Sequence, residues 1–311
     1  MIRPRTRAVS FWAVRRLLLT SAGIRNDLLR SALADLIGKP FERAAVAVIP
    51  TASAAAAGDH GWVLDDLTRL RGLGWRELGI VELNGLPKPM VLGRLRRADV
   101  IYAEGGNHYH LANSIVANGL AAELAAILES TVYVGASAGS MIFSRNLSER
   151  AGLAFGERDD LRILGETPVR PPFGLFDWYL KPHLNSPDFP GRTRAWFERA
   201  AAKLPFPVYA LDDNSAVRVR GDETDVVSAG EWLLLNGTGR ELPATRRRRA
   251  ADAAEGQRPD RPRLPRGDRH RGAGGRGRVL ARALHPRFPG RLRRDTRAVP
   301  DPAHSDRKSV V

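Results

Sequence analysis

The sequence predicts an α/β protein with a doubly wound, mostly parallel sheet. Between residues 17 and 145, short apolar runs alternate with segments of helical periodicity, a pattern typical of right-handed βαβ crossovers. One of these runs leads directly into Gly-Ala-Ser-Ala-Gly at residues 135–139, the kind of tight turn that joins a buried strand to a helix. Doubly wound sheets bind ligands at the carboxyl ends of their strands, so we expect the functional site there.

The alternation can be followed element by element along the chain. Strands are expected at residues 17–23, 45–51, 78–83, 99–103 and 131–134, and helices at 26–37, 62–73, 90–97 and 111–128. Beyond these, 175–180 and 208–211 are predicted as strands, followed by paired short strands at 216–220, 224–228 and 231–235. The run at 45–51 is almost entirely apolar and β-branched, which favours a strand buried on both faces of a parallel sheet.

Charge is distributed unevenly along the 311 residues. The formal net charge is +15, and residues 244–311 alone contain 20 Lys or Arg against 7 Asp or Glu. Residues 17–243 are slightly acidic, with 24 basic and 27 acidic side chains. We therefore expect one folded body over residues 16–243. The extension at 1–15 and the Arg/Pro/Gly-rich tail at 244–311 are expected to be disordered, because they bury too little apolar surface to offset the entropy of ordering.

The basic tail allows three interpretations. We favour a disordered segment without a specific partner. It could instead be an arm that binds nucleic acid through phosphate contacts, or the out-of-frame translation of a GC-rich gene. For the body we expect no nucleic-acid partner, and association into a homodimer is left open.

Composition also excludes some classes of protein. No apolar run reaches the roughly 18 residues that a membrane-spanning helix needs, so we expect a cytoplasmic protein with no membrane partner. The chain has no Cys, which excludes disulfides, thiolate metal sites and a cysteine nucleophile.

Ser137, at the centre of the glycine-rich turn, is the candidate nucleophile. A turn of this kind holds the central residue in a strained backbone conformation with its side chain above the sheet. The helix that follows directs its free N–H groups and the positive end of its dipole to the same place, where an anion would be stabilised. The alternative is a strand-to-helix turn with an incidental serine.

A second glycine-rich loop follows the strand expected at 99–103. Its paired glycines would let the backbone approach a bound group, and the N–H groups of Gly106 and Ala138 would together form an oxyanion hole. The alternative is a turn that only starts the next helix, with Asn107 as its N-cap.

His183 is the candidate general base, because it lies where a predicted strand ends and neutral imidazole accepts protons near pH 7. His108 and His110, with Glu104 nearby, would be a conceivable metal site. Two histidines at a helix start are usually solvated or capping residues, so we expect no metal.

An acid is needed to orient the imidazole and stabilise its protonated form. Asp212 and Asp213 follow the strand expected at 208–211, and one of them could face His183. The alternative is that both belong to an Asp-Asp-Asn turn between two strands.

Four motifs occur in order: Gly-Gly-Asn-x-x-x-Leu at 105–111, Val-Gly-x-Ser-Ala-Gly at 134–139, Pro-His at 182–183 and Leu-Asp-Asp-x-x-Ala at 211–216. In this combination the chain resembles, over about residues 16–237, the peptidase E (aspartyl dipeptidase) family of serine peptidases, which also includes the cyanophycinases. The resemblance implies a fold similar to class I glutamine amidotransferases, with helices on both faces of the sheet. It makes residues 16–243 the catalytic domain.

Carried over to this sequence, the resemblance implies Ser137 as nucleophile, His183 as base and Asp213 as acid. Peptidase E has a glutamate at the acid position, so Asp212 stays a rival. Glu149 and Glu157, closer to the nucleophile, stay rivals as well.

Arg194, in the Gly-Arg-Thr-Arg segment at 191–194, is similar to the arginine thought to receive the substrate's aspartyl carboxylate in this family; a solvated helix-start arginine is the alternative. Asn107 is the second candidate for substrate binding. The implied reaction is hydrolysis of short peptides, foremost dipeptides with N-terminal Asp, through an acyl-enzyme and without metal or organic cofactor. The same residues would also suit a serine hydrolase with another substrate, such as a cyanophycin-like β-aspartyl peptide. A catalytically inactive binding protein is the other alternative.

Overall fold

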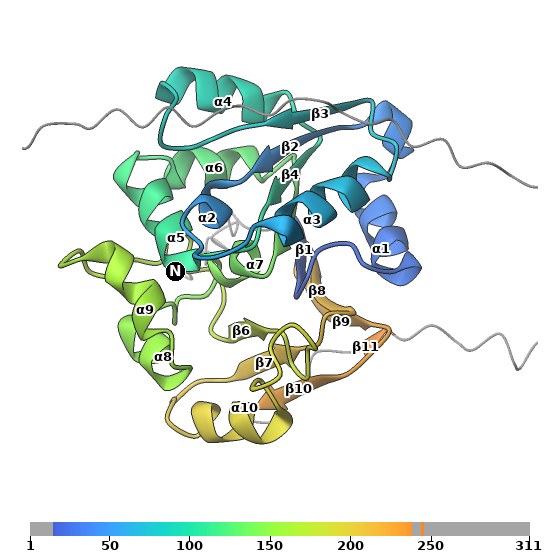
Figure 1. Ribbon diagram of the computed structural model, residues 1–311. Helices are drawn as coiled ribbons and strands as arrows, with labels where there is room; N and C mark the ends of the chain where they lie inside the picture. The colour runs from blue at the N-terminus through green and yellow to red at the C-terminus, as the bar shows by residue number, and fades with distance from the viewer. Residues whose placement is uncertain (1–14, 238–243, 246–311) are drawn as a thin grey trace, which may run out of the picture. The chain divides into compact units, whose positions relative to one another are not determined.

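The computed structural model describes residues 15–237 and 244–245 (Figure 1). The expectations for residues 1–14 and 246–311, including the nucleic-acid-binding arm, lie outside these residues. The strands are β1 (Arg16–Thr20), β2 (Ala45–Ile49), β3 (Glu77–Ile80), β4 (Val100–Ala103), β5 (Val132–Ala136), β6 (Tyr179–Pro182), β7 (Val208–Leu211), β8 (Ser215–Arg220), β9 (Glu223–Ser228), β10 (Trp232–Leu235) and β11 (Ala244–Thr245).

Helices connect most of the strands in the first half of the chain. They are α1 (Asp27–Ile37), α2 (Thr51–Ala54), α3 (Gly61–Arg71), α4 (Lys88–Arg96), α5 (His108–Ala117), α6 (Ala121–Ile127), α7 (Ala138–Met141), α8 (Glu149–Ala154), α9 (Arg158–Leu161) and α10 (Arg194–Ala201), with 3₁₀ turns η1 (Phe41–Arg43) and η2 (Arg162–Leu164). No helix within the described part of the chain is long and apolar enough to cross a membrane.

The larger sheet has the strand order β11-β9-β8-β1-β5-β4-β2-β3. From β1 to β3 every neighbouring pair is parallel, whereas β8 runs antiparallel to β1 and β9 antiparallel to β8. The predicted doubly wound, mostly parallel fold is confirmed. The two residues of β11 pair with β9 and lie just beyond the predicted end of the body at 243.

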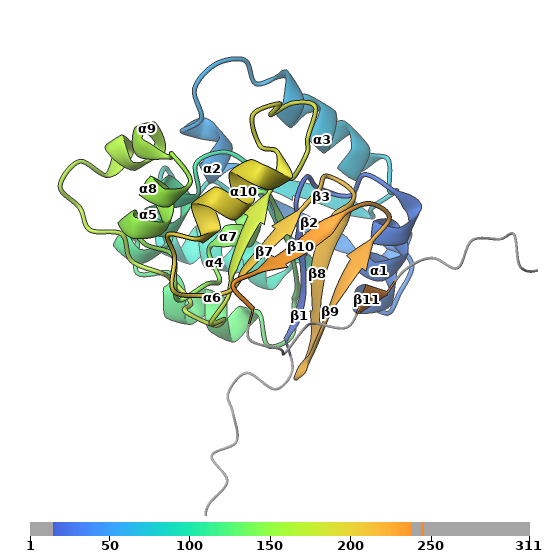
Figure 2. The same ribbon diagram turned by 90° about the horizontal axis from the view of Figure 1, so that it is seen from below.

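Both faces of this sheet are covered, as β1 illustrates, because its successive side chains belong to two different apolar clusters. Leu18 belongs to the apolar cluster that includes Leu33 of α1 and Leu70 of α3. Leu17, next to it in the strand, belongs to the opposite cluster, with Leu95 of α4 and others. Figures 1 and 2 show α1 and α3 on one side of the strands and α4 to α6 on the other. Because β1 is buried on both faces, its carboxyl end is held firmly beside β5.

A second sheet of three strands, in the order β10-β7-β6, stands beside the larger one (Figure 1). The strand expected at 175–180 starts later, at Tyr179, and runs to Pro182. The strand expected at 231–235 pairs with β7 and not with β9. Asp212 and Glu231 continue this pairing beyond the strand ends: the Asp212 backbone N–H donates to the Glu231 carbonyl at 3.0 Å, and the Asp212 side chain accepts from the Glu231 N–H at 2.6 Å.

The prediction of one long helix at 111–128 was wrong. The chain forms two helices, α5 and α6, separated at Asn118 and Gly119. Gly119 has a φ of +60°, a left-handed conformation that ends a helix. The Asn118 side chain donates to the Ser114 carbonyl at 2.9 Å and so satisfies a carbonyl at the end of α5.

The sharp turn from β5 into α7 depends on Gly139, which packs directly on β4. A β-carbon on Gly139 would lie 2.3 Å from the Ala103 carbonyl oxygen. We expect Gly139→Ala to lower the free energy of unfolding by about 1–3 kcal/mol, because the added methyl group forces β4 and α7 apart. Urea denaturation measures this change.

Gly79→Ala in β3 is the matched control, since a β-carbon there meets no atom within 4 Å. Equal stability of the two variants would contradict the close packing of α7 on β4.

Candidate active site

The turn between β5 and α7 displays Ser137 in a strained conformation. Its φ is +47° and its ψ is −104°, a combination that residues with a side chain rarely adopt. The preceding Gly135 makes this possible, because a β-carbon on it would lie 2.5 Å from the Ser140 nitrogen. The Ser140 hydroxyl donates to the Thr20 carbonyl at 2.7 Å. The turn is thereby tied to the end of β1.

His183 reaches Ser137 from the second sheet. It follows β6 directly, and its ring Nε2 lies 2.9 Å from the Ser137 Oγ. The backbone turns sharply there, with a φ of +70° at His183. Its N–H donates to the Ser21 hydroxyl at 2.8 Å, so the loop after β1 holds the histidine where the two sheets meet.

Asp213 completes a line of hydrogen bonds from the serine. Its Oδ1 lies 2.8 Å from Nδ1 of His183. The Ser186 hydroxyl donates to Oδ2 at 2.5 Å, and the Ser21 hydroxyl lies 3.3 Å from Oδ1. Arg25 adds a longer contact to Oδ2 at 3.4 Å. The carboxylate is thus oriented by several donors besides the imidazole.

The protonation states of this pair suit proton transfer. Burial opposes ionisation of Asp213, but the bonds from His183 and Ser186 outweigh it and lower its pKa to about 2. Burial lowers the pKa of His183 below its usual value, although Asp213 acts in the opposite direction. At neutral pH the aspartate is therefore ionised and the imidazole is neutral, so its Nε2 can accept the serine proton.

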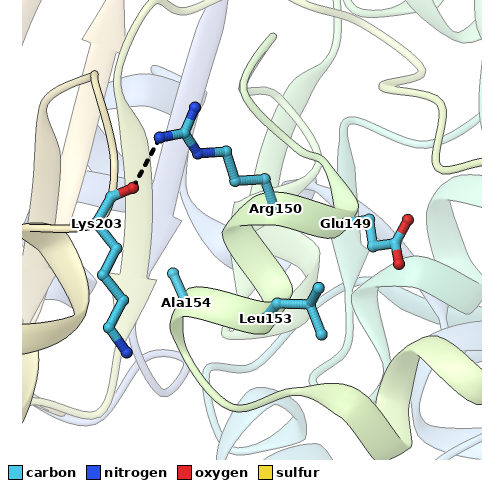
Figure 3. A pocket seen from close by; sticks show the side chains of 5 residues that line it. All are labelled: Glu149, Arg150, Leu153, Ala154 and Lys203. Carbon is cyan, nitrogen blue, oxygen red and sulfur yellow. Dashed lines mark hydrogen bonds between the residues drawn. The ribbon is translucent and has the colours of Figure 1, made fainter.

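The structure places the three rival acids elsewhere. Asp212 accepts hydrogen bonds from the Asn214 N–H, the Ser215 hydroxyl and the Glu231 N–H. Glu149 lines a surface pocket of about 460 Å³ together with Arg150, Leu153, Ala154 and Lys203 (Figure 3). Glu157 forms an ion pair with Lys181. Among the four candidate acids, Asp213 has the hydrogen bond to His183.

Glu157 belongs to a buried polar network beside the site. Tyr109 donates to its Oε2 at 3.1 Å, and Nε2 of His108 lies 3.6 Å from the same oxygen. Burial would raise the pKa of Glu157, but Lys181 and His108 hold it below its usual value. His108 has a pKa lowered to about 4 by burial. His108 is therefore neutral at pH 7, in keeping with a structural place in the core.

The glycine loop after β4 lies close to α2. Gly106 has a φ of +122°, and a β-carbon on it would lie 2.3 Å from the Ala52 carbonyl oxygen. Only glycine fits that position. Ala138, the second expected oxyanion donor, directly follows Ser137 and begins α7. The oxyanion hole formed by these two N–H groups remains a prediction.

Asn107 caps α5. Its side chain accepts from the His110 N–H at 2.9 Å and donates to the Asp160 carbonyl at 3.0 Å. It is also buried. The capping alternative is what the structure shows for this side chain, and a contact between Asn107 and substrate remains a prediction.

Two arginines of the 191–194 segment differ in their surroundings. Arg194 is exposed and pairs with Glu231 at 2.7 Å and Glu198 at 3.9 Å. The Arg192 guanidinium lies 4.0 Å over the Phe189 ring, and that ring lies 4.5 Å from the His183 ring. Burial lowers the pKa of Arg192, while Glu157, Asp160 and Asp213 raise it. The arginine nearer the serine–histidine pair is therefore Arg192.

A pair of buried carboxyl groups lies behind the glycine loop. Asp66 of α3 accepts from the Tyr102 hydroxyl and from Arg69 at 3.2 Å. Glu104 is 1% exposed, and its Oε1 has no hydrogen-bond partner among the described residues. The pKa of Glu104 is raised to about 8, mainly by burial and also by the negative charge of the neighbouring Asp66. Glu104 therefore titrates close to neutral pH.

The sequence analysis did not single out Arg192. It also did not single out the groups that hold Asp213 in place. Ser21 had one detectable signal, since it directly follows the first predicted strand at the sheet edge where ligands bind. Ser186 and Arg25 had none, because only the folded chain brings them to Asp213. The described residues contain no group of three or more His, Asp or Glu side chains arranged to hold a metal ion.

Comparison with known proteins points to one family. The profile of peptidase family S51 matches residues 17–227. The peptidase E of Shewanella denitrificans is 28% identical over 155 residues, which are 48% of this chain and 62% of that protein. The peptidase E of Streptomyces coelicolor is 31% identical over 138 residues, 42% of this chain and 53% of that protein. The chain thus matches less than two thirds of the length of these relatives.

Solved structures support the fold. A Listeria monocytogenes EGD-e protein described as a candidate peptidase E superposes with a TM-score of 0.56 at 20% identity, covering 70% of this chain and 100% of that one. A peptidase from an acI-B1 actinobacterium superposes with a TM-score of 0.55 at 21% identity, covering 75% of this chain and 96% of that one.

The raised pKa of Glu104 predicts a pH-dependent stability. Because its ionisation is opposed in the fold, the free energy of unfolding is expected to fall as pH rises from about 4.5 to about 8. Glu104→Gln has no carboxyl group to ionise at this position, so its free energy of unfolding should not fall in this way. The difference in stability between the variant and the parent should therefore grow from about pH 4.5 to about pH 8 and stay constant above it. Urea unfolding of both proteins at about pH 5, 7 and 9 measures the difference.

Glu77→Gln on the exposed surface of β3 serves as the control. A stability difference between Glu104→Gln and the parent that stays constant with pH would show that Glu104 does not titrate in this range.

Proposed function

The chain belongs to peptidase family S51, and on this basis we propose that it is a serine peptidase that cleaves dipeptides with an N-terminal aspartate. The observation that carries the proposal is the line of hydrogen bonds from Ser137 through His183 to Asp213, at 2.9 and 2.8 Å. Nucleophile, base and orienting acid in this arrangement are the groups that acyl transfer requires.

The proposed reaction begins when the Ser137 Oγ attacks the scissile carbonyl carbon. Nε2 of His183 takes the serine proton, and Asp213 stabilises the protonated ring through Nδ1. The N–H groups of Gly106 and Ala138 donate to the oxyanion. As the carbon–nitrogen bond breaks, Nε2 gives its proton to the leaving amine. A water molecule then attacks the acyl-enzyme with the same base, which releases the acid and restores Ser137.

Arg192 is the proposed receptor for the substrate's aspartyl carboxylate. Its guanidinium lies over the Phe189 ring, which in turn lies against the His183 ring, and burial lowers its pKa. Arg194, the arginine that the sequence pointed to, already faces Glu231 and Glu198. A partly buried guanidinium can hold a carboxylate with two parallel hydrogen bonds.

Purified protein incubated with Asp-Leu, Glu-Leu and Ala-Leu tests the proposal. We expect cleavage of Asp-Leu alone and a loss of at least about 10³-fold in Ser137→Ala, because the attacking oxygen is gone. If no dipeptide is cleaved but Ser137 reacts with a fluorophosphonate probe, the activity belongs to another acyl substrate, such as a β-aspartyl peptide. Failure of both would indicate a binding protein.

A matched pair of arginine variants tests the carboxylate receptor. We expect Arg192→Gln to lower kcat/KM for Asp-Leu by about 10–100-fold, because a charge-assisted contact to the substrate is lost. Arg194→Gln should stay within about twofold of the parent, because an exposed ion pair contributes little. Steady-state kinetics measure both, and the reverse order would restore Arg194 as the receptor.

A further inference from the structure

Trp62 lies beside the nucleophile although the proposed mechanism does not use it. A β-carbon on Gly105 would lie 3.3 Å from Cζ3 of Trp62 and 3.5 Å from Cβ of Ser137. The indole and the serine therefore border the same small space, which is open because residue 105 is a glycine. Trp62 is 39% exposed, so the protein leaves part of this residue uncovered.

The indole is held in place by its neighbours. Trp62 is the second residue of α3, and its ring stacks on His60 with a centroid distance of 6.2 Å and an interplanar angle of 23°. His60 is itself fixed, since its Nε2 lies 2.9 Å from the Ser53 carbonyl oxygen. An aromatic ring fixed in this way and only partly covered is a preformed surface for an apolar group.

Two groups near Ser137 differ in chemistry. Near His183, the Phe189 ring is covered by the Arg192 guanidinium at 4.0 Å, which suits a negatively charged group. Near Gly105, the indole of Trp62 offers an apolar surface instead. A dipeptide with an acidic first residue can use both if its second residue is apolar.

We propose that Trp62 binds the apolar side chain of the residue whose amine leaves, so that the enzyme prefers Leu or Phe over Gly in the second position of its substrate. The identity of the bond that breaks rests on the proposed function. Contact with the indole removes apolar surface of both groups from water, and Trp62 is a specificity-determining residue because it touches the substrate.

Kinetics on matched dipeptides test this assignment. For the parent enzyme we expect a higher kcat/KM on Asp-Leu and Asp-Phe than on Asp-Gly. Trp62→Ala should lower kcat/KM on Asp-Leu and Asp-Phe by about tenfold and leave Asp-Gly within about twofold, and Trp62→Phe should recover part of the loss. Leu64→Ala, at a 66% exposed position on the same helix, is the control and should leave kcat/KM for all three dipeptides unchanged. An equal effect of Trp62→Ala on all three dipeptides would overturn the proposal.

Hydrolysis of phenyl acetate and methyl acetate tests the indole surface without any peptide, because the alcohol that leaves takes the place of the leaving amine. In both reactions the Ser137 Oγ bonds to the acetyl carbon, His183 takes the serine proton and gives it to the departing alcohol, and water then releases acetate. We expect Trp62→Ala to lower kcat/KM for phenyl acetate by about tenfold and to leave kcat/KM for methyl acetate within about twofold of the parent.

The two experiments separate the two proposals. If the parent cleaves no Asp dipeptide but its hydrolysis of phenyl acetate depends on Trp62, the proposed substrate is wrong and the apolar site stands. If the parent cleaves Asp-Leu but Trp62→Ala changes neither the dipeptide preference nor the ratio of kcat/KM for the two esters, the function stands and the role of Trp62 is overturned.

Discussion

The strained backbone of Ser137 is the constraint on which the rest of the site depends. A φ of +47° in a residue with a side chain is unfavourable by itself, so the surrounding packing must impose it. Gly135 and Gly139 allow that packing, because a β-carbon on either would lie within 2.5 Å of a backbone atom. Ser140 adds hydrogen bonds to the Thr20 and Gly135 carbonyls. The buried parallel sheet thus supplies the stability that keeps the serine hydroxyl in place.

The site is assembled from two sheets, and neither sheet contains all of it. The larger sheet provides Ser137, while the smaller one provides His183 at the end of β6 and Asp213 after β7. Ser21 links them, since its hydroxyl accepts from the His183 N–H and also approaches Asp213. One short loop after β1 therefore orients both partners of the serine.

The acidic side chains around the site differ in their burial and in their hydrogen-bond partners, and these differences determine their pKa values. Asp213 stays ionised because its hydrogen bonds outweigh its burial. Glu104 has the opposite balance, since burial and the nearby Asp66 favour its protonated form. Glu157 is ionised against Lys181. Asp213 and Glu157 are thus ionised at neutral pH, whereas Glu104 is largely protonated, and among these three acids Asp213 contacts His183.

The sequence by itself determined the local structure: the alternation of strands and helices, the glycine-flanked turn at Ser137, and His183 at a strand end. These follow from periodicity and from the steric freedom of glycine, which depend on neighbouring residues only. The tertiary structure alone decided which acid meets His183, that β10 joins β7, that Arg192 lies near the His183 ring, and that Trp62 borders Ser137. Each of these is a contact between segments far apart in the chain, and such contacts depend on how the two sheets pack and not on local pattern.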